Sequence, residues 1–182
     1  MPSDLTIFAA KYLVFVDAVI AVALCLWLVT QRPRPAVVRW VIAVVIMLVL
    51  SLVFSRIGAA LISDPRPFTQ DHVKPLISHA ADNGFPSDHA LLAAAIVAAV
   101  LLIAPMWSIP FIVLGFLVDW ARIGAGIHHV EDVVGSSVIV AIALLIALAV
   151  ATPIADRLRP YLPAAWGSDA EAAGTTARPA SP

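Results

Sequence analysis

Five long apolar stretches, separated by polar or proline-containing segments, restrict this chain to very few folds. They cover approximately residues 12–29, 37–62, 89–104, 111–123 and 133–152. A hydrocarbon core about 30 Å thick needs about 20 apolar residues in a helix, and a helix satisfies its own backbone hydrogen bonds in lipid. Because 62% of the residues are hydrophobic and 13% are charged, few polar side chains remain to cover a water-soluble globule. We predict an all-α integral membrane protein, a bundle of about five transmembrane helices.

Composition divides the chain into three segments. We expect residues 1–11 to form a short external N-terminus and residues 12–155 to form one membrane-embedded domain. From residue 156 onward, Ala, Pro, Gly, Ser and Thr replace most large apolar side chains, so we predict that residues 156–182 are a disordered cytoplasmic tail. The net charge of -1 provides no basic face for nucleic acid, and the single Cys25 excludes a disulfide framework.

Arginine and histidine positions give the bundle an expected orientation. With five spans, one side of the membrane carries most of the arginines near span ends: Arg32, Arg34, Arg157, Arg159 and Arg178. The positive-inside rule makes that side cytoplasmic. The opposite side then carries all the histidines: His72, His79, His89, His128 and His129. We therefore predict a multi-pass protein of a plasma membrane with its active site on the extracytoplasmic side.

The stretch Asn83–His89 leads directly into the third apolar stretch and is one candidate part of that site. A Gly-Phe-Pro turn delivers Ser87, Asp88 and His89 to the first turn of the expected helix. Free backbone N–H groups and the helix dipole favour an anion there. Ser87 either caps this helix or turns its hydroxyl group toward the anion.

Arg66 lies between Pro65 and Pro67 at the external end of the second stretch. The two prolines restrict the backbone, so the planar guanidinium group can be held for bidentate contact with a phosphate. An interfacial arginine that only extends its head group to water is the alternative.

A further candidate part lies between the fourth and fifth stretches. Arg122 precedes His128 by six residues, and Asp132 follows His128 by four. If the fifth helix begins near His128, this spacing places His128 and Asp132 on one face. The carboxylate would then accept the Nδ1 proton and leave Nε2 free as a nucleophile. An ordinary interfacial histidine is the alternative for His128.

Three motifs, taken in their order along the chain, resemble those of the type 2 phosphatidic acid phosphatase superfamily. They are Arg-Pro at Arg66, Pro-Ser-x-His at 86–89, and an Arg followed by His and Asp at Arg122, His128 and Asp132. Each motif is weak alone, but the three together are specific. The resemblance extends over the whole membrane-embedded domain.

A narrower resemblance is to the bacitracin-resistance type of undecaprenyl-diphosphate phosphatase. It rests on Pro65–Phe68, His79–Asp82 and Phe85–His89. It implies that residues 12–155 form a phosphatase domain in a bacterial plasma membrane. The substrate would be a polyprenyl diphosphate, and its hydrolysis would recycle the lipid carrier for peptidoglycan and cell-wall synthesis.

The resemblance also implies a role for each candidate residue. His128 would attack phosphorus and form a phosphohistidine, Asp132 would orient His128, and His89 would act as general acid and then general base. The phosphate would be bound by Arg66, Ser87, Arg122 and, as an additional candidate, Lys74. Two guanidinium groups supply the positive charge that a metal otherwise would, so no metal and no cofactor are expected.

The chain departs from the superfamily pattern at two informative positions. A lysine is expected seven residues before the arginine of the Arg-Pro motif, where this chain has Ala59. Lys74, Arg56 or a second phosphate-bound water are the candidate substitutes. The superfamily has a glycine directly before the motif histidine, where this chain has Asp88. The bacitracin-resistance type also has an aspartate at this position.

Two other functions stay open. One is a broader lipid-phosphate phosphatase that acts on phosphatidic acid, phosphatidylglycerophosphate or a prenyl-phosphate sugar. The other is a non-catalytic membrane protein that binds anionic lipid head groups, which Ala59 and Asp88 favour. The partners expected in every case are lipids of the bilayer, and no sequence feature indicates an oligomeric state.

Overall fold

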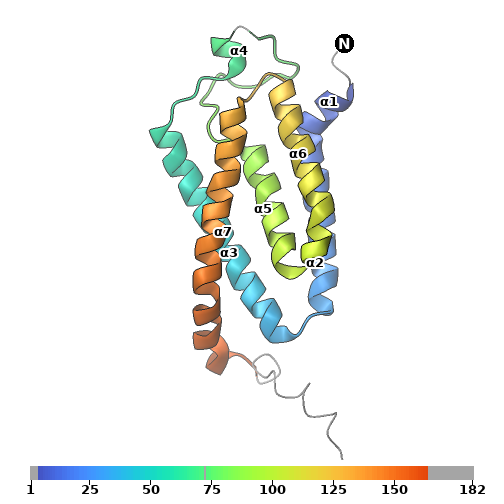
Figure 1. Ribbon diagram of the computed structural model, residues 1–182, viewed down its shortest axis with the longest axis vertical. Coiled ribbons are helices and arrows are strands. Elements are labelled where there is room, and N and C mark those ends of the chain that lie inside the picture. The colour runs from blue at the N-terminus through green and yellow to red at the C-terminus, as the bar shows by residue number, and fades with distance from the viewer. Residues whose placement is uncertain (1–3, 72, 164–182) are drawn as a thin grey trace, which may run out of the picture.

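The computed structural model describes residues 4–71 and 73–163, which form a bundle of helices (Figure 1). The long helices are α2 (Val14–Thr30), α3 (Arg34–Leu61), α5 (Asp88–Ile103), α6 (Ser108–Gly124) and α7 (Val130–Leu158). The short ones are α1 (Asp4–Phe8), the π-helix η1 (Ala9–Leu13), α4 (Pro67–Gln70), and the 3-10 helices η2 (Pro105–Trp107) and η3 (Arg159–Tyr161). Since the described residues form no strand, the predicted all-helical class is confirmed.

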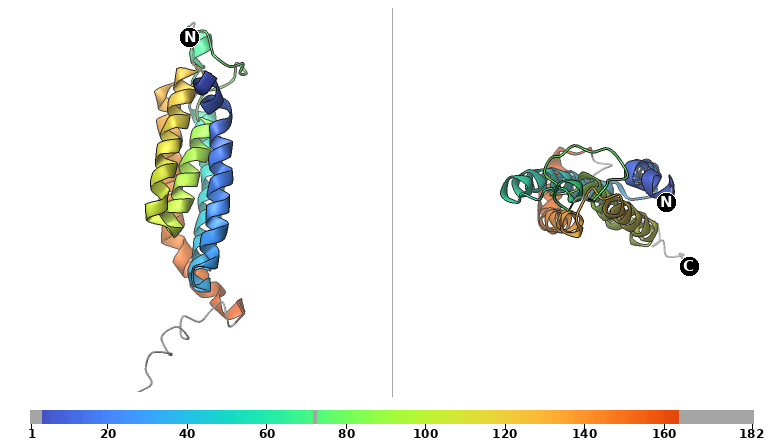
Figure 2. Two further views of the ribbon diagram at one scale, coloured as in Figure 1. Left: turned by 90° about the vertical axis from the view of Figure 1, so that its right-hand side faces the viewer. Right: turned by 90° about the horizontal axis from the view of Figure 1, so that it is seen from above.

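Four helical segments of the described chain are long and apolar enough to cross a membrane: Asp4–Thr30, Arg34–Leu61, Pro105–Gly124 and Val130–Tyr161. The remaining predicted span, α5, has 16 residues, which is about 24 Å at a rise of 1.5 Å per residue. It contacts α2, α3, α6 and α7 and is the central helix (Figures 1 and 2). The helical membrane bundle is therefore confirmed, with a central helix shorter than a full span.

Small side chains let the helices around α5 approach closely. Its buried residues include Ala90, Ala93, Ala95 and Ala98. Buried alanines also recur every four residues along α7 from Ala143 to Ala155. Small residues at helix contacts allow close packing of helices in lipid, where no hydrophobic force drives the helices together.

The connections alternate between the two ends of the bundle. One end, here named the loop end, carries α1, residues 62–71 and 73–87, and residues 125–129 (Figure 1). The opposite end carries the α2–α3 turn, the α5–α6 turn and the C-terminal end of α7. This alternation matches the one expected for five spans, and it places the arginines Arg32, Arg34, Arg157 and Arg159 at the end opposite the loop end.

Helix boundaries differ from the sequence expectation at both ends of the chain. The first helix begins at Asp4 instead of near residue 12, and its residue Ala10 is buried in a hydrophobic cluster that includes Ile77 and Ala121. The last helix continues to Leu158, beyond the expected boundary at residue 155. Most of the predicted tail, residues 164–182, lies outside the described residues, as do His72 and residues 1–3.

Candidate active site

A cavity of about 380 Å³ opens at the loop end of the bundle. Its walls come from α3, the loop of residues 62–87, the first turn of α5, and the chain around the end of α6. Of the predicted site residues, the cavity is lined by Arg66, His89, Arg122 and His128. Segments far apart in the sequence therefore meet around one polar space.

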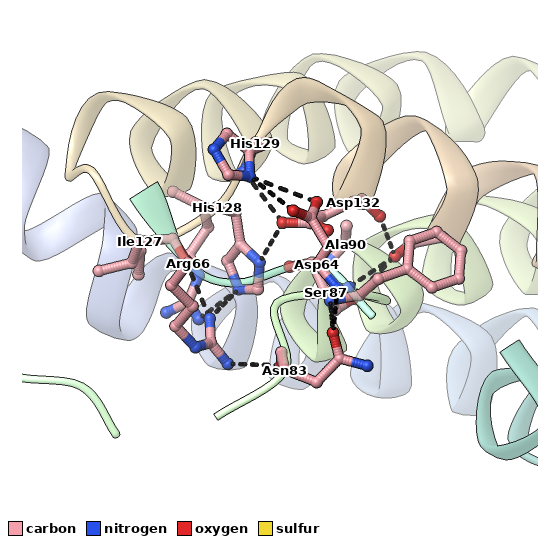
Figure 3. Close-up of polar contacts among 12 residues, drawn as sticks. Asp64, Arg66, Asn83, Ser87, Ala90, Ile127, His128, His129 and Asp132 are labelled. Carbon is pink, nitrogen blue, oxygen red and sulfur yellow. Dashed lines mark hydrogen bonds and ion pairs between the residues drawn. The ribbon is translucent and has the colours of Figure 1, made fainter. Parts of the chain in front are cut away.

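His128 lies at the centre of this group and is only 2% exposed. Its Nε2 atom is 3.2 Å from Nη1 of Arg66 and 3.2 Å from Nη2 of Arg122. A guanidinium group only donates hydrogen bonds, so Nε2 is the acceptor and the proton of the neutral ring is on Nδ1. Nδ1 in turn lies 3.2 Å from Oδ2 of Asp132, which accepts that proton (Figure 3). The unprotonated nitrogen therefore lies between two cationic groups.

The start of α7 brings Asp132 to His128 in a way that differs from the expectation. The helix begins at Val130, two positions after His128, and His129 is its N-cap. Asp132 is at the third helical position, where its Oδ2 accepts a hydrogen bond from the His129 backbone N–H at 2.9 Å. The same oxygen accepts the Nδ1 proton of His128. The capping contact thus fixes the carboxylate that orients the imidazole ring.

Burial is the largest influence on the protonation of His128. Burial lowers the pKa of His128, the nearby charges of Arg122 and Arg66 lower it further, and the hydrogen bond to Asp132 raises it. The net direction is downward. A histidine with a lowered pKa stays neutral to a lower pH than usual, so the ring is uncharged at pH 7 and Nε2 keeps its lone pair.

We predict that the His128 ring titrates below its ordinary pKa of about 6.5. At pH 7 it should be the tautomer with the proton on Nδ1. Nitrogen-15 NMR of histidine-labelled protein in detergent measures both properties, and His128→Gln assigns the signal. A ring that is protonated at pH 7, or that carries its proton on Nε2, would contradict the hydrogen-bond assignment.

Arg66 is held in place from three directions. Its Nε donates to Asp82 Oδ1 at 2.7 Å, Nη1 donates to the Ile127 carbonyl at 2.9 Å, and Nη2 donates to the Asn83 carbonyl at 3.3 Å. The Arg66 guanidinium lowers the pKa of the Asp82 carboxyl group, which keeps this partner ionised. These fixed contacts hold the guanidinium plane beside His128.

Arg122 is held by a part of the chain that the sequence did not single out. Its Nη1 donates to the backbone carbonyl of Ala10 at 3.1 Å. Ala10 belongs to the π-helix η1, and short π-helical turns are frequent at functional sites. His79 also lies close to Arg122, with 3.5 Å between its Nε2 and Nη2 of Arg122. The N-terminal helix therefore supports the site.

Asn83 ties the loop to the end of α3. Its Oδ1 accepts hydrogen bonds from the backbone N–H of Asp64 at 2.9 Å and of Phe85 at 3.2 Å. Its Nδ2 donates to the carbonyls of Ala59 at 3.0 Å and Ile62 at 2.8 Å. The last carbonyls of a helix need such partners. The amide of Asn83 thus supplies them and fixes the turn that leads into α5.

The Phe85 ring fits into a notch that two glycines leave open. Gly58 on α3 and Gly135 on α7 face the ring from two helices. A Cβ atom would lie 3.0 Å from the ring at Gly58 and would overlap the ring at Gly135. The absence of both side chains therefore positions the turn that carries Ser87, Asp88 and His89.

Gly135→Ala should consequently destabilise the protein and reduce activity. Forcing a methyl group into this contact is expected to cost about 1–3 kcal/mol in the free energy of unfolding, although alanine is the better helix former. Gly115→Ala is the matched control, because its Cβ would meet Ala93 at an ordinary 3.7 Å. Thermal unfolding in detergent measures both. Equal melting temperatures for Gly135→Ala and wild type would show that the Phe85 ring does not need the space left by Gly135.

Two predicted phosphate-binding residues, Ser87 and Lys74, do not line the cavity. Ser87 is fully buried, caps α5 by accepting from the Ala90 N–H, and does not line the cavity. The capping alternative therefore describes its contacts, and a phosphate contact stays a prediction. Lys74 is exposed and is not among the lining residues. Asp88 lines the cavity wall beside His89.

A group of carboxylates and an imidazole lies behind His128. Asp64, His129 and Asp132 each offer one metal-ligand atom, and these atoms lie within 4.8 Å of one another. The His129 ring already contacts Asp64 on one nitrogen and Asp71 on the other, at 3.3 and 3.0 Å. The Asp71 contact raises the pKa of His129. A protonated His129 can therefore supply the positive charge that this group of acids needs.

Comparison with known proteins adds to this geometry. The family model described as the PAP2 superfamily matches residues 40–159. "Undecaprenyl-diphosphatase BcrC" of Bacillus subtilis (strain 168) is 31% identical over 159 residues, which are 87% of this chain and 78% of that protein. YbjG of Escherichia coli (strain K12), provisionally named an undecaprenyl-diphosphatase, is 35% identical over 134 residues, 72% of this chain and 65% of that protein.

A third relative carries a different kind of name. "Bacitracin transport permease protein BcrC" of Bacillus licheniformis is 30% identical over 140 residues, which are 76% of this chain and 66% of that protein. No solved structure matches the chain. The resemblance to the bacitracin-resistance type is thus confirmed by the relatives, and the wider assignment by the family model. The chain belongs to the PAP2 superfamily, as a phosphatase of the bacitracin-resistance type.

Proposed function

We propose that this membrane phosphatase releases inorganic phosphate from a polyprenyl diphosphate, with undecaprenyl diphosphate as the expected substrate, through a phosphohistidine intermediate. The observation that carries the proposal is the state of His128. Its Nε2 is unprotonated and lies between the guanidinium groups of Arg66 and Arg122, while Nδ1 is held by Asp132. A nucleophile beside two cations suits attack on an anionic phosphoryl group. The names of two relatives support the substrate.

In the first step, Nε2 of His128 attacks the terminal phosphorus while the bond to the bridging oxygen breaks. Arg66 and Arg122 stabilise the charge on the equatorial oxygens, and Asp132 stabilises the imidazolium that forms. His89 gives a proton to the departing oxygen. The products are a phosphohistidine and a prenyl monophosphate.

In the second step, His89 takes a proton from a water molecule that attacks the phosphohistidine. The N–P bond breaks, inorganic phosphate leaves, and the imidazole is restored. His89 and His128 line the same cavity, which supports this sharing of roles. The step needs only the groups already present, and we propose that no metal takes part.

The proposed location is the extracytoplasmic side of a bacterial plasma membrane. The site is at the loop end, and Arg32, Arg34, Arg157 and Arg159 are at the opposite end of the bundle, which the positive-inside rule makes cytoplasmic. A diphosphate carried on a lipid would enter from the outer leaflet with its chain in the bilayer. Its hydrolysis there would return the carrier to cell-wall synthesis.

Phosphate release by purified protein in detergent tests the proposal. Undecaprenyl diphosphate, phosphatidic acid, phosphatidylglycerophosphate and a prenyl-phosphate sugar should be compared, each with and without a chelator. We expect the highest kcat/KM for the diphosphate and no effect of the chelator. A higher value for a monoester would favour the broader lipid-phosphate phosphatase. If none of these substrates releases phosphate, the protein is not a phosphatase. If the chelator abolishes activity, the proposed metal independence is wrong.

A further inference from the structure

The cavity continues from the catalytic group along one face of α3. Its lining residues on this helix are Leu52, Ser55, Arg56 and Ala59. This spacing is that of a single helical face, and it covers about 10 Å along the axis at 1.5 Å per residue. Because α3 ends at Leu61 at the loop end, this wall leads from the loop toward the interior of the bilayer.

Arg56 is a cation on this wall that the proposed mechanism does not use. It is exposed and, within the described part of the chain, has no hydrogen-bond or ion-pair partner. Arg66 and Arg122 differ from it, because they are 5% and 4% exposed and bind fixed partners. A guanidinium group without a partner keeps all its donors for a ligand.

The position of Arg56 relative to His128 indicates which part of a lipid diphosphate it would contact. It lies one helical turn before Ala59, on the same face and on the bilayer side. In a lipid diphosphate, the terminal phosphate reacts at His128, and the other phosphate lies between it and the lipid chain. With the lipid chain in the bilayer, the second phosphate would lie on the bilayer side of the terminal phosphate, and Arg56 is on the cavity wall that extends in this direction.

Electrostatics favours a cation at this place. A diphosphate brings a second anionic group into a cavity that Asp88 also lines, and a carboxylate repels it. The superfamily lysine that could offset this charge is Ala59 here. A planar arginine can bind two phosphate oxygens at once.

We propose that Arg56 binds the phosphate that stays on the lipid and thereby makes the site selective for a diphosphate over a monophosphate. This inference rests on the proposed function, since it explains how the same site would recognise a diphosphate. Arg56 contacts the substrate but not the phosphorus that reacts. Replacing Arg56 should therefore lower the hydrolysis of diphosphates and leave the hydrolysis of monophosphates nearly unchanged.

The test compares wild type, Arg56→Gln, Arg56→Lys and the double variant Arg56→Gln/Ala59→Lys. For each, kcat/KM is measured on a prenyl diphosphate and on a prenyl monophosphate of the same chain, and inhibition is measured with pyrophosphate and with inorganic phosphate. Arg39→Gln is the matched control, an arginine of the same helix near its other end. Thermal unfolding checks that every variant is folded.

Arg56→Gln should lower kcat/KM for the diphosphate by roughly 10- to 100-fold, the effect of losing a charged hydrogen-bond donor. It should weaken pyrophosphate inhibition by a similar factor and change the monophosphate and phosphate values by less than about 3-fold. Arg56→Lys and the double variant should recover part of the diphosphate activity. Equal losses on both substrates, or no loss on the diphosphate, would overturn the inference. Wild type that hydrolyses no diphosphate would instead count against the proposed function itself.

Discussion

Replacing His128 with alanine should reduce phosphate release by at least about 10⁴-fold on every lipid phosphate tested, as expected when a covalent nucleophile is removed. Arg66 and Arg122 are both directed at Nε2 of His128 and cannot themselves act as nucleophiles at neutral pH. The remaining cations and the cavity would still bind phosphate. The loss should therefore appear in kcat and hardly in KM.

His129→Ala is the matched control for His128→Ala. The two histidines are adjacent, but the His129 ring contacts Asp64 and Asp71 instead of the arginines. Its backbone N–H, which binds Asp132, is kept in the alanine variant. We expect less than about a 10-fold change for this control. A His128→Ala protein that is folded by thermal unfolding and keeps more than a few per cent of wild-type activity would exclude His128 as the nucleophile.

Replacing His89 with alanine should have an effect that depends on the leaving group. On phosphatidic acid, the leaving oxygen becomes a basic alkoxide, so loss of the general acid should lower kcat/KM by about 10²- to 10⁴-fold. On a prenyl diphosphate, the leaving group is a phosphate with a second pKa near about 6. It leaves without much help, so the loss should be less than about 10-fold.

Paired measurements of kcat/KM on both substrates test the role of His89, with wild type and His89→Ala assayed side by side. The ratio of the two losses cancels differences in protein yield and in detergent. Equal losses would count against a diphosphate as the preferred substrate. A larger loss on the diphosphate would contradict the assignment of His89 as the proton donor.

The apolar stretches and the short-range motifs could be predicted from the sequence because their information is local. The alternation of the five long helices between the two ends of the bundle follows from their order in the chain, and His128 and Asp132 are only four residues apart. The pairing arises even though α7 begins at Val130 instead of near His128, because a capping aspartate points back over the N-terminus of its helix.

Contacts between distant segments could not be predicted in this way. The Ala10 carbonyl meets Arg122 across 112 positions, and Arg66 meets the Ile127 carbonyl across 61. Neither carbonyl has a sequence signature, since every residue carries one. The notch for Phe85 depends likewise on two glycines from different helices. These supports of the site follow from the packed bundle.

Ser87 shows how a motif can be found without its contacts being known. The Pro-Ser-x-His motif correctly placed a helix start at this residue. Its backbone is bound by Ser136 of α7, whose hydroxyl accepts from the Ser87 N–H at 2.9 Å and donates to the Ser87 carbonyl at 3.1 Å. That partner lies 49 positions away, so the sequence alone left the capping and phosphate-binding roles equally open.

The covalent intermediate can be measured directly. Protein mixed briefly with a diphosphate labelled in its terminal phosphate and quenched in base should carry label that is stable in base and labile in acid. Mass spectrometry should assign the label to His128, and His128→Ala should carry none. A wild-type enzyme that turns over the diphosphate without label on His128, or with the label on another residue, would contradict nucleophilic attack by His128.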